Sequence, residues 1–127
     1  MQVVRGSEIQ FTPASHEDPK KPGVLKRVLA QKSDLIRGQV QMVNWSNLPK
    51  DSGFQPHYHE DMQEIFIMLG GPVSMRVDEE TVELQAGDVI LIDPREVHEM
   101  KNVSDGDVEY VVFGISTEQG GKTIVVG

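Results

Sequence analysis

The sequence predicts an all-β domain, and three observations carry that prediction. Apolar and polar residues alternate over short segments such as residues 39–42, which is the two-residue period of a half-buried strand. Glycine, proline and aspartate, the residues that form turns, separate these segments at short intervals. No ten-residue window has an apolar stripe with the 3.6-residue period of a helix. Periodicity alone leaves open whether the strands form a sandwich or a barrel.

The elements follow from the same signals, taken in chain order. Residues 13–23 hold three prolines, so we expect an irregular loop or arm there, with His16 as a solvated loop histidine. Polar or glycine-rich turns are expected at residues 47–53, 78–80 and 104–107. Residues 123–126 form either an edge strand or part of a loose tail. Strands are expected at residues 23–30, 38–45, 64–69, 73–77, 81–84, 89–92, 97–103 and 108–115.

Size and charge narrow the range of functions. A chain of 127 residues is most simply one domain. Its 12 basic and 20 acidic residues give a formal net charge of −8, which argues against nucleic acid and against anionic membranes as partners. The chain has no cysteine and therefore neither a disulfide nor a thiolate ligand. No leader-like segment or membrane span is evident, so we expect a cytoplasmic protein.

Three histidines and a glutamate are candidate metal ligands. His57 and His59 are two residues apart, so on a strand they present their imidazoles to the same face. Glu64 opens an apolar run that would place its carboxylate on the next strand, and His98 opens a further strand after a second apolar run. Nitrogen donors with one carboxylate suit a single divalent transition metal, namely Fe, Mn, Ni, Cu or Zn, rather than Ca or Mg.

The spacing of these residues resembles two motifs of the small single-domain cupins. After His57 and His59, four residues precede Glu64 and six more precede Gly71, as in the first motif. The glycine, histidine and asparagine of the second motif fall on Gly87, His98 and Asn102. The resemblance spans residues 23–115. It implies a double-stranded β-helix, also called a jelly-roll barrel, of the RmlC-like superfamily. It also implies that His57, His59, Glu64 and His98 are the metal ligands, and that Asn102 is structural.

Three positions depart from the motifs, and all three lie in loops. The nearest glycine before the histidine pair is Gly53, with three residues between it and His57 instead of five. The proline of the second motif is displaced by one, because Asp93 holds its place and Pro94 follows. Arg95 replaces the inner glycine of that motif. The four ligand positions themselves are intact.

With this resemblance, the chain divides into an N-terminal strand and irregular arm (1–22), the barrel (23–116) and a tail or edge strand (117–127). Side chains of Glu64's parity, Phe66 and Met68, would face the interior, and Trp45 and Phe54 would line the site or pack in the core. Glu60, Asp61 and Glu99 neighbour the ligands in sequence, and we expect them to be surface charge. Small cupins commonly form homodimers, which the resemblance implies here too.

Three hypotheses for the function remain open, each with a small molecule bound in the barrel. An open metal site with three histidines and a glutamate resembles that of cupin dioxygenases and oxalate-handling enzymes, which favours a metal-dependent dioxygenase. A sugar or sugar-phosphate isomerase, similar to mannose-6-phosphate isomerase, would need a base and a cation for phosphate, for which Arg37, Arg76 and Arg95 are candidates. The third hypothesis is a non-catalytic ligand-binding cupin. The sequence identifies no catalytic residue beyond the metal ligands.

Overall fold

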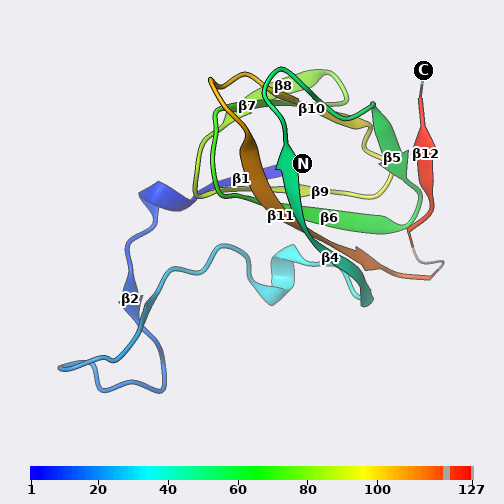
Figure 1. Cartoon of the computed structure of the whole chain (residues 1–127). Helices are drawn as coiled ribbons and strands as arrows, with labels where there is room; N and C mark the ends of the chain where they lie inside the picture. The colour runs from blue at the N-terminus through cyan, green and yellow to red at the C-terminus, as the bar shows by residue number, and fades with distance from the viewer. Residues whose placement is uncertain (119–120, 127) are drawn as a thin grey trace.

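The computed structural model describes residues 1–118 and 121–126, and these form two facing five-stranded antiparallel sheets (Figure 1). The first sheet has the strand order β1-β9-β6-β11-β4, and the second has the order β12-β5-β10-β7-β8. A short hairpin of β2 and β3 stands apart from both. The strands are β1 (Gln2–Arg5), β2 (Thr12–Pro13), β3 (Leu25–Lys26), β4 (Gln39–Leu48), β5 (His57–His59), β6 (Met62–Met68), β7 (Val73–Val77), β8 (Glu80–Leu84), β9 (Asp88–Ile92), β10 (His98–Asn102), β11 (Val108–Ser116) and β12 (Thr123–Val125). Two 3-10 turns, η1 (Gly6–Glu8) and η2 (Lys32–Asp34), lie in the N-terminal third.

The main apolar core fills the space between the two sheets. Phe66 and Met68 of β6 face this core, as their parity with Glu64 predicted, and they meet Met75 of β7 and Met100 of β10 from the opposite sheet. Alternation on a strand explains the pattern, since every second residue of β7 is fully buried while Ser74 and Arg76 are only partly buried. The all-β prediction is confirmed, and the core between the facing sheets defines the barrel.

A second apolar cluster covers the outer face of the first sheet. Ile65, Val89, Leu91 and Ile115 are buried there, on the face opposite the main core. Leu29, Ala30, Leu35 and Ile36, which precede β4, are packed against them. Strands β6 and β9 are therefore buried on both faces, which explains why their sequences are nearly continuous apolar runs rather than alternating ones.

Two expectations from the sequence are wrong in this region. Only Leu25–Lys26 of the predicted strand 23–30 pairs with another strand, because Leu29 and Ala30 instead pack on the outer cluster. Trp45 lies neither in the core nor at the ligand cluster, because its parity on β4 directs it outward and 70% of its surface is exposed. The other predicted strands are present, with ends shifted by a few residues.

Both ends of the described chain join the sheets. The predicted N-terminal strand forms as β1 and pairs with β9, and the C-terminal edge strand forms as β12 and pairs with β5. The proposed division at residues 22 and 116 stays a prediction. Among the described residues, no helix is long and apolar enough to cross a membrane.

Candidate metal centre

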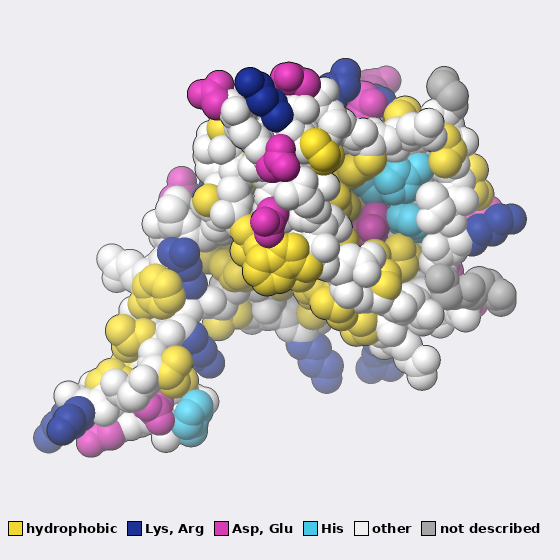
Figure 2. Space-filling view, in the orientation of Figure 1, with side chains coloured by type: hydrophobic (Ala, Val, Ile, Leu, Met, Phe, Trp, Pro, Cys, Tyr) yellow, Lys and Arg dark blue, Asp and Glu magenta, His cyan; other side chains and the backbone are white. Residues whose placement is uncertain are grey.

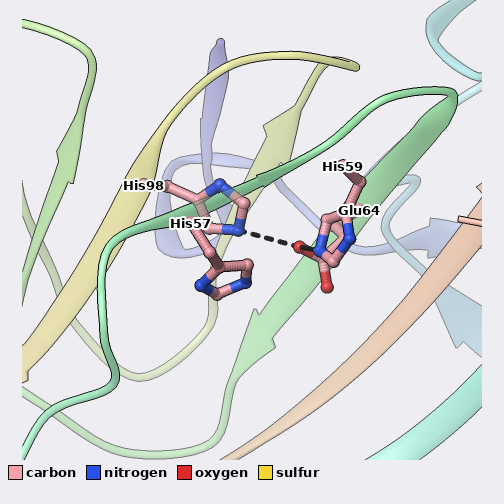
Figure 3. Close-up of side chains that lie close together, drawn as sticks. All are labelled: His57, His59, Glu64 and His98. Atoms are coloured by element: carbon pink, nitrogen blue, oxygen red, sulfur yellow. Dashed lines mark hydrogen bonds and ion pairs between the residues drawn. The ribbon is translucent and has the colours of Figure 1, made fainter. Parts of the chain in front are cut away.

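The four predicted ligands converge between the two sheets (Figure 3). His57 and His59 extend from one face of β5, and His57 lies directly opposite His98 in the β5–β10 pairing. Glu64 reaches the same point from β6 in the other sheet. One potential ligand atom from each of the four residues lies within 4.8 Å of all the others. The structure thus brings together all the residues that the spacing predicted.

Hydrogen bonds at the outer ring nitrogens orient two of the imidazoles. The Nδ1–H of His57 donates to the Gln55 carbonyl at 2.7 Å, and that of His98 donates to the Glu96 carbonyl at 2.9 Å. A carbonyl only accepts, so the ring proton lies on Nδ1 and Nε2 is left with a lone pair directed inward. This is the outer arrangement that fixes the tautomer of a metal-binding histidine.

The inner nitrogens lie unusually close to a carboxylate oxygen. Glu64 Oε1 is 2.9 Å from Nε2 of His59 and 2.8 Å from Nε2 of His98. The buried His59 Nε2 has no hydrogen-bond partner among the described residues, so its approach to Glu64 is short without the direction of a hydrogen bond. A carboxylate and an imidazole lone pair repel each other unless a proton or a cation lies between them. The donor set therefore fits a divalent cation that would be shared by these atoms.

The electrostatics of the cluster agree with shared positive charge at this point. Burial raises the pKa of the Glu64 carboxyl, but hydrogen bonds and positive charge from His59 and His98 outweigh burial and hold that pKa at about 2. Burial lowers the pKa of His59, yet the hydrogen bond and charge of Glu64 bring the pKa above its usual 6.5. Burial and the neighbouring imidazoles lower the pKa of His57. His57 is therefore already neutral, while a metal would displace a proton from His59.

Aromatic rings form one wall of the centre, and the mouth is open. Phe54 stacks on Phe66 with ring centroids 6.2 Å apart and meets His57 edge-on at 5.2 Å. His98 is fully buried, whereas His57 is only half-buried. In Figure 2, imidazole and carboxylate side chains are visible in a hollow of the barrel, so the cluster is accessible from solvent. Phe54 thus takes the wall position predicted for it.

The chain after β11 supports the site, which the sequence did not reveal. Thr123 of β12 places its hydroxyl oxygen 3.2 Å from Nδ1 of His59. The Asp61 carboxylate accepts hydrogen bonds from the Ser116 hydroxyl at 2.7 Å and from the Gly121 N–H at 3.1 Å. The expectation that Asp61 is surface charge is therefore wrong. Its partners lie more than fifty residues away in sequence, beyond the reach of any local pattern.

Comparison with known proteins places this geometry in a family. The cupin domain family matches residues 44–114, which contain the four candidate ligands. The chain belongs to the cupin family. An oxalate-binding protein of Thermotoga maritima is 29% identical over 109 residues, which are 86% of this chain and 89% of that protein.

Two solved structures illustrate the shared fold. A double-stranded β-helix protein of Klebsiella pneumoniae superposes with a TM-score of 0.63 and 16% identity, over 73% of this cupin and 79% of that chain. Bacillus subtilis oxalate decarboxylase, in a study of its Mn(II) centres, superposes with a TM-score of 0.60 and 16% identity. That match covers 70% of this cupin and 24% of the decarboxylase. The predicted jelly-roll barrel is confirmed.

The departures from the cupin motifs leave the loop beside the site intact. Arg95, at the place of the motif glycine, adopts the left-handed φ of 72° that glycine favours. Its backbone N–H donates to the His59 carbonyl at 2.7 Å, so the loop still abuts β5. Asn102 is buried; its side-chain amide donates to the carbonyls of Leu48 and Gly106 and accepts from Ser104. These contacts give Asn102 the structural role that the motif implied.

The three candidate arginines occupy different settings in this cupin. Arg76 pairs with Glu99 at 2.8 Å, and both alternate with core residues on their strands, so they lie on the outer face. Arg37 lines a groove beside β4, away from the ligand cluster. Arg95 lies next to the site through its backbone and has an exposed side chain.

Proposed function

We propose that this cupin holds one divalent transition metal on His57, His59, Glu64 and His98 and binds a small carboxylate anion there. The observation that carries the proposal is the convergence of three imidazole nitrogens and one carboxylate oxygen within 4.8 Å. Two of the imidazoles have their outer nitrogens already satisfied by backbone carbonyls, which leaves the inner nitrogens as donors.

Charge and coordination favour an anion as the ligand. Three neutral imidazoles and one carboxylate leave a divalent ion with net positive charge, and four protein donors leave open positions on an octahedral ion. A small carboxylate supplies both the negative charge and the oxygen donors. The relative from Thermotoga maritima is described as oxalate-binding, and the Bacillus subtilis enzyme is an oxalate decarboxylase. Oxalate is therefore the first ligand to test.

A metal in this position would supply Lewis acidity and, if it were Fe, Mn or Cu, redox chemistry. The protein's own contribution is positioning and exclusion of water. Phe54 and Phe66 form an apolar wall next to the histidines, while half-buried His57 lies at the accessible side. This partly dry, open centre also favours the second candidate, a dioxygenase acting on a small molecule. The isomerase hypothesis has less support, because Arg76 is already paired with Glu99 on the outer face.

Metal analysis tests the site, with the protein purified without added metal or chelator. We expect near-stoichiometric transition metal in the native chain and its loss in the His57→Ala, His59→Ala double variant. His16→Ala is the matched control, because His16 lies on the exposed arm and should leave the metal content unchanged. If no metal is found and none can be loaded, the four-ligand proposal is wrong.

Ligand titration then tests the function. Calorimetry with oxalate should show binding to the metal-loaded chain and none to the metal-free chain. Equal binding to both forms would contradict binding through the metal. Oxygen consumption on small-molecule panels separates the two candidates: uptake supports a dioxygenase, and binding without turnover supports a binding protein.

A further inference from the structure

The N-terminal third contains an arm that stands away from the barrel (Figure 1). We define the arm as residues 11–28, which include the β2–β3 hairpin. Ala14 N–H donates to the Val24 carbonyl at 3.2 Å, and the Glu17 carboxylate accepts from Val24 N–H at 3.0 Å. Among the described residues, every hydrogen bond of residues 11–26 joins two members of the arm. The arm is thus internally ordered but lacks polar attachment to its own barrel.

The arm presents apolar side chains to solvent. Phe11, Val24, Leu25 and Val28 are each about half exposed, between 46% and 56%. Figure 2 shows hydrophobic side chains along the projecting segment. Four large apolar residues on so small a segment form a patch of the kind that proteins normally cover by contact with another surface.

The barrel carries a second uncovered apolar surface, on the outer side of β4. We define this β4 face as Val40, Val43 and Trp45, which are 56%, 68% and 70% exposed. It continues into a groove of about 960 Å³ whose apolar walls are Leu35, Ile36, Val40 and Ile115. Strand β4 is also the ten-residue edge of its sheet, and long exposed edges are usually covered or paired.

The charges of the two surfaces are complementary. Residues 11–30 contain four basic and two acidic residues, whereas the rest of the chain contains eight basic and eighteen acidic ones. A positive arm is therefore attracted to the negative body of another molecule. Each chain has one arm and one β4 face, so reciprocal contact between two copies covers both surfaces on both chains and closes as a two-fold pair.

We propose that two copies of this chain exchange arms, with residues 11–28 of each packed on the β4 face and the adjoining groove of the other. This inference does not depend on the metal or on the identity of the ligand. It names a second copy as the partner because one sequence carries both of the uncovered apolar surfaces.

Sedimentation equilibrium on the full chain tests the exchange. We expect a dimer, and we expect Phe11→Ser and Trp45→Ser each to weaken dimerisation by at least about tenfold, because buried aromatic anchors contribute most to interfaces. Leu69→Ser is the matched control: Leu69 is 44% exposed, lies outside the arm and the β4 face, and should leave the dimer unchanged. Far-UV circular dichroism and retained metal content verify that each variant folds.

Crosslinking tests the register directly, because the chain has no cysteine. A Leu25→Cys chain mixed with a Val43→Cys chain should form a disulfide-linked pair under mild oxidation, at twice the chain mass of 14.1 kDa. A monomeric native protein would overturn the proposal. So would a dimer that is weakened by only one of the two serine variants, or one in which the mixed chains fail to crosslink.

Discussion

Replacing Glu64 by glutamine isolates the charge at the centre of the candidate site. The substitution preserves size and removes only the negative charge. In the metal-free protein, Oε1 of Glu64 lies 2.9 Å from His59 Nε2 and 2.8 Å from His98 Nε2, and the residue is 5% exposed. The carboxylate therefore stabilises the fold through two buried partners that glutamine can satisfy only in part.

The size of the effect follows from the pKa of Glu64. Burial raises it, but the two histidines hold it at about 2 rather than 4.5. At about 1.4 kcal/mol per pKa unit, this corresponds to roughly 3 kcal/mol of unfolding free energy, which is an upper value because glutamine retains hydrogen bonding. We expect Glu64→Gln to lose about 2 to 3 kcal/mol.

The pH dependence gives the sign. A lowered carboxyl pKa contributes stability that is complete above pH 4.5 and is lost as the pH falls toward 2. The raised pKa of His59 contributes stability that is complete below pH 6.5 and is lost as the pH rises through the higher folded value. The difference between native and variant protein should therefore be largest between pH 4.5 and 6.5 and should shrink on both sides.

Urea unfolding of the metal-free chains, followed by circular dichroism across this pH range, measures the difference. Glu60→Gln is the matched control, since Glu60 is an exposed acid near the site and should change the free energy little. If Glu64→Gln unfolds with the same free energy as the native chain, or if the difference stays constant with pH, the reasoning about coupled charges is refuted.

Three further predictions concern the residues around the ligands. Thr123→Val should weaken metal affinity by roughly 10- to 100-fold in a competition assay with a chelator, with Thr123→Ser restoring it, because the hydroxyl orients His59. Asn102→Ala should lower the free energy of urea unfolding by about 2 kcal/mol, because it leaves buried carbonyls unpaired; an unchanged midpoint would contradict its structural role. Arg95→Gly should raise that free energy by roughly 1 kcal/mol by relieving the left-handed φ, whereas Arg95→Ala should not.

The features that the sequence predicted well depend on short-range periodicity. His57 and His59 share a face because they are two residues apart on β5, and Glu64 shares its face with Phe66 and Met68 for the same reason. The apolar runs that flank the ligands form the strands that hold them. The ligand cluster could therefore be predicted from local spacing together with the family resemblance.

The features that failed depend on long-range packing. Trp45 was a candidate for the core, but the pairing of β4 with β11 sets its parity and directs it outward. Residues 23–30 have the composition of a strand, yet Leu29 and Ala30 find an apolar surface on the first sheet instead of a pairing partner. Asp61 binds the loop after β11, more than fifty residues away in sequence. In each case a distant partner overrides the local preference.

The position of the ligands also links the site to the stability of the barrel. Three donors come from β5 and β10 of the second sheet, and Glu64 comes from β6 of the first. In the metal-free chain, contacts across the gap join a carboxylate to two imidazoles, and their strength depends on protonation. A divalent ion held by all four residues would replace those protons and connect the two sheets without depending on them. Metal binding, the pKa of His59 and the cohesion of the sheets are therefore three measures of one interaction, and Glu64 is the residue common to all of them.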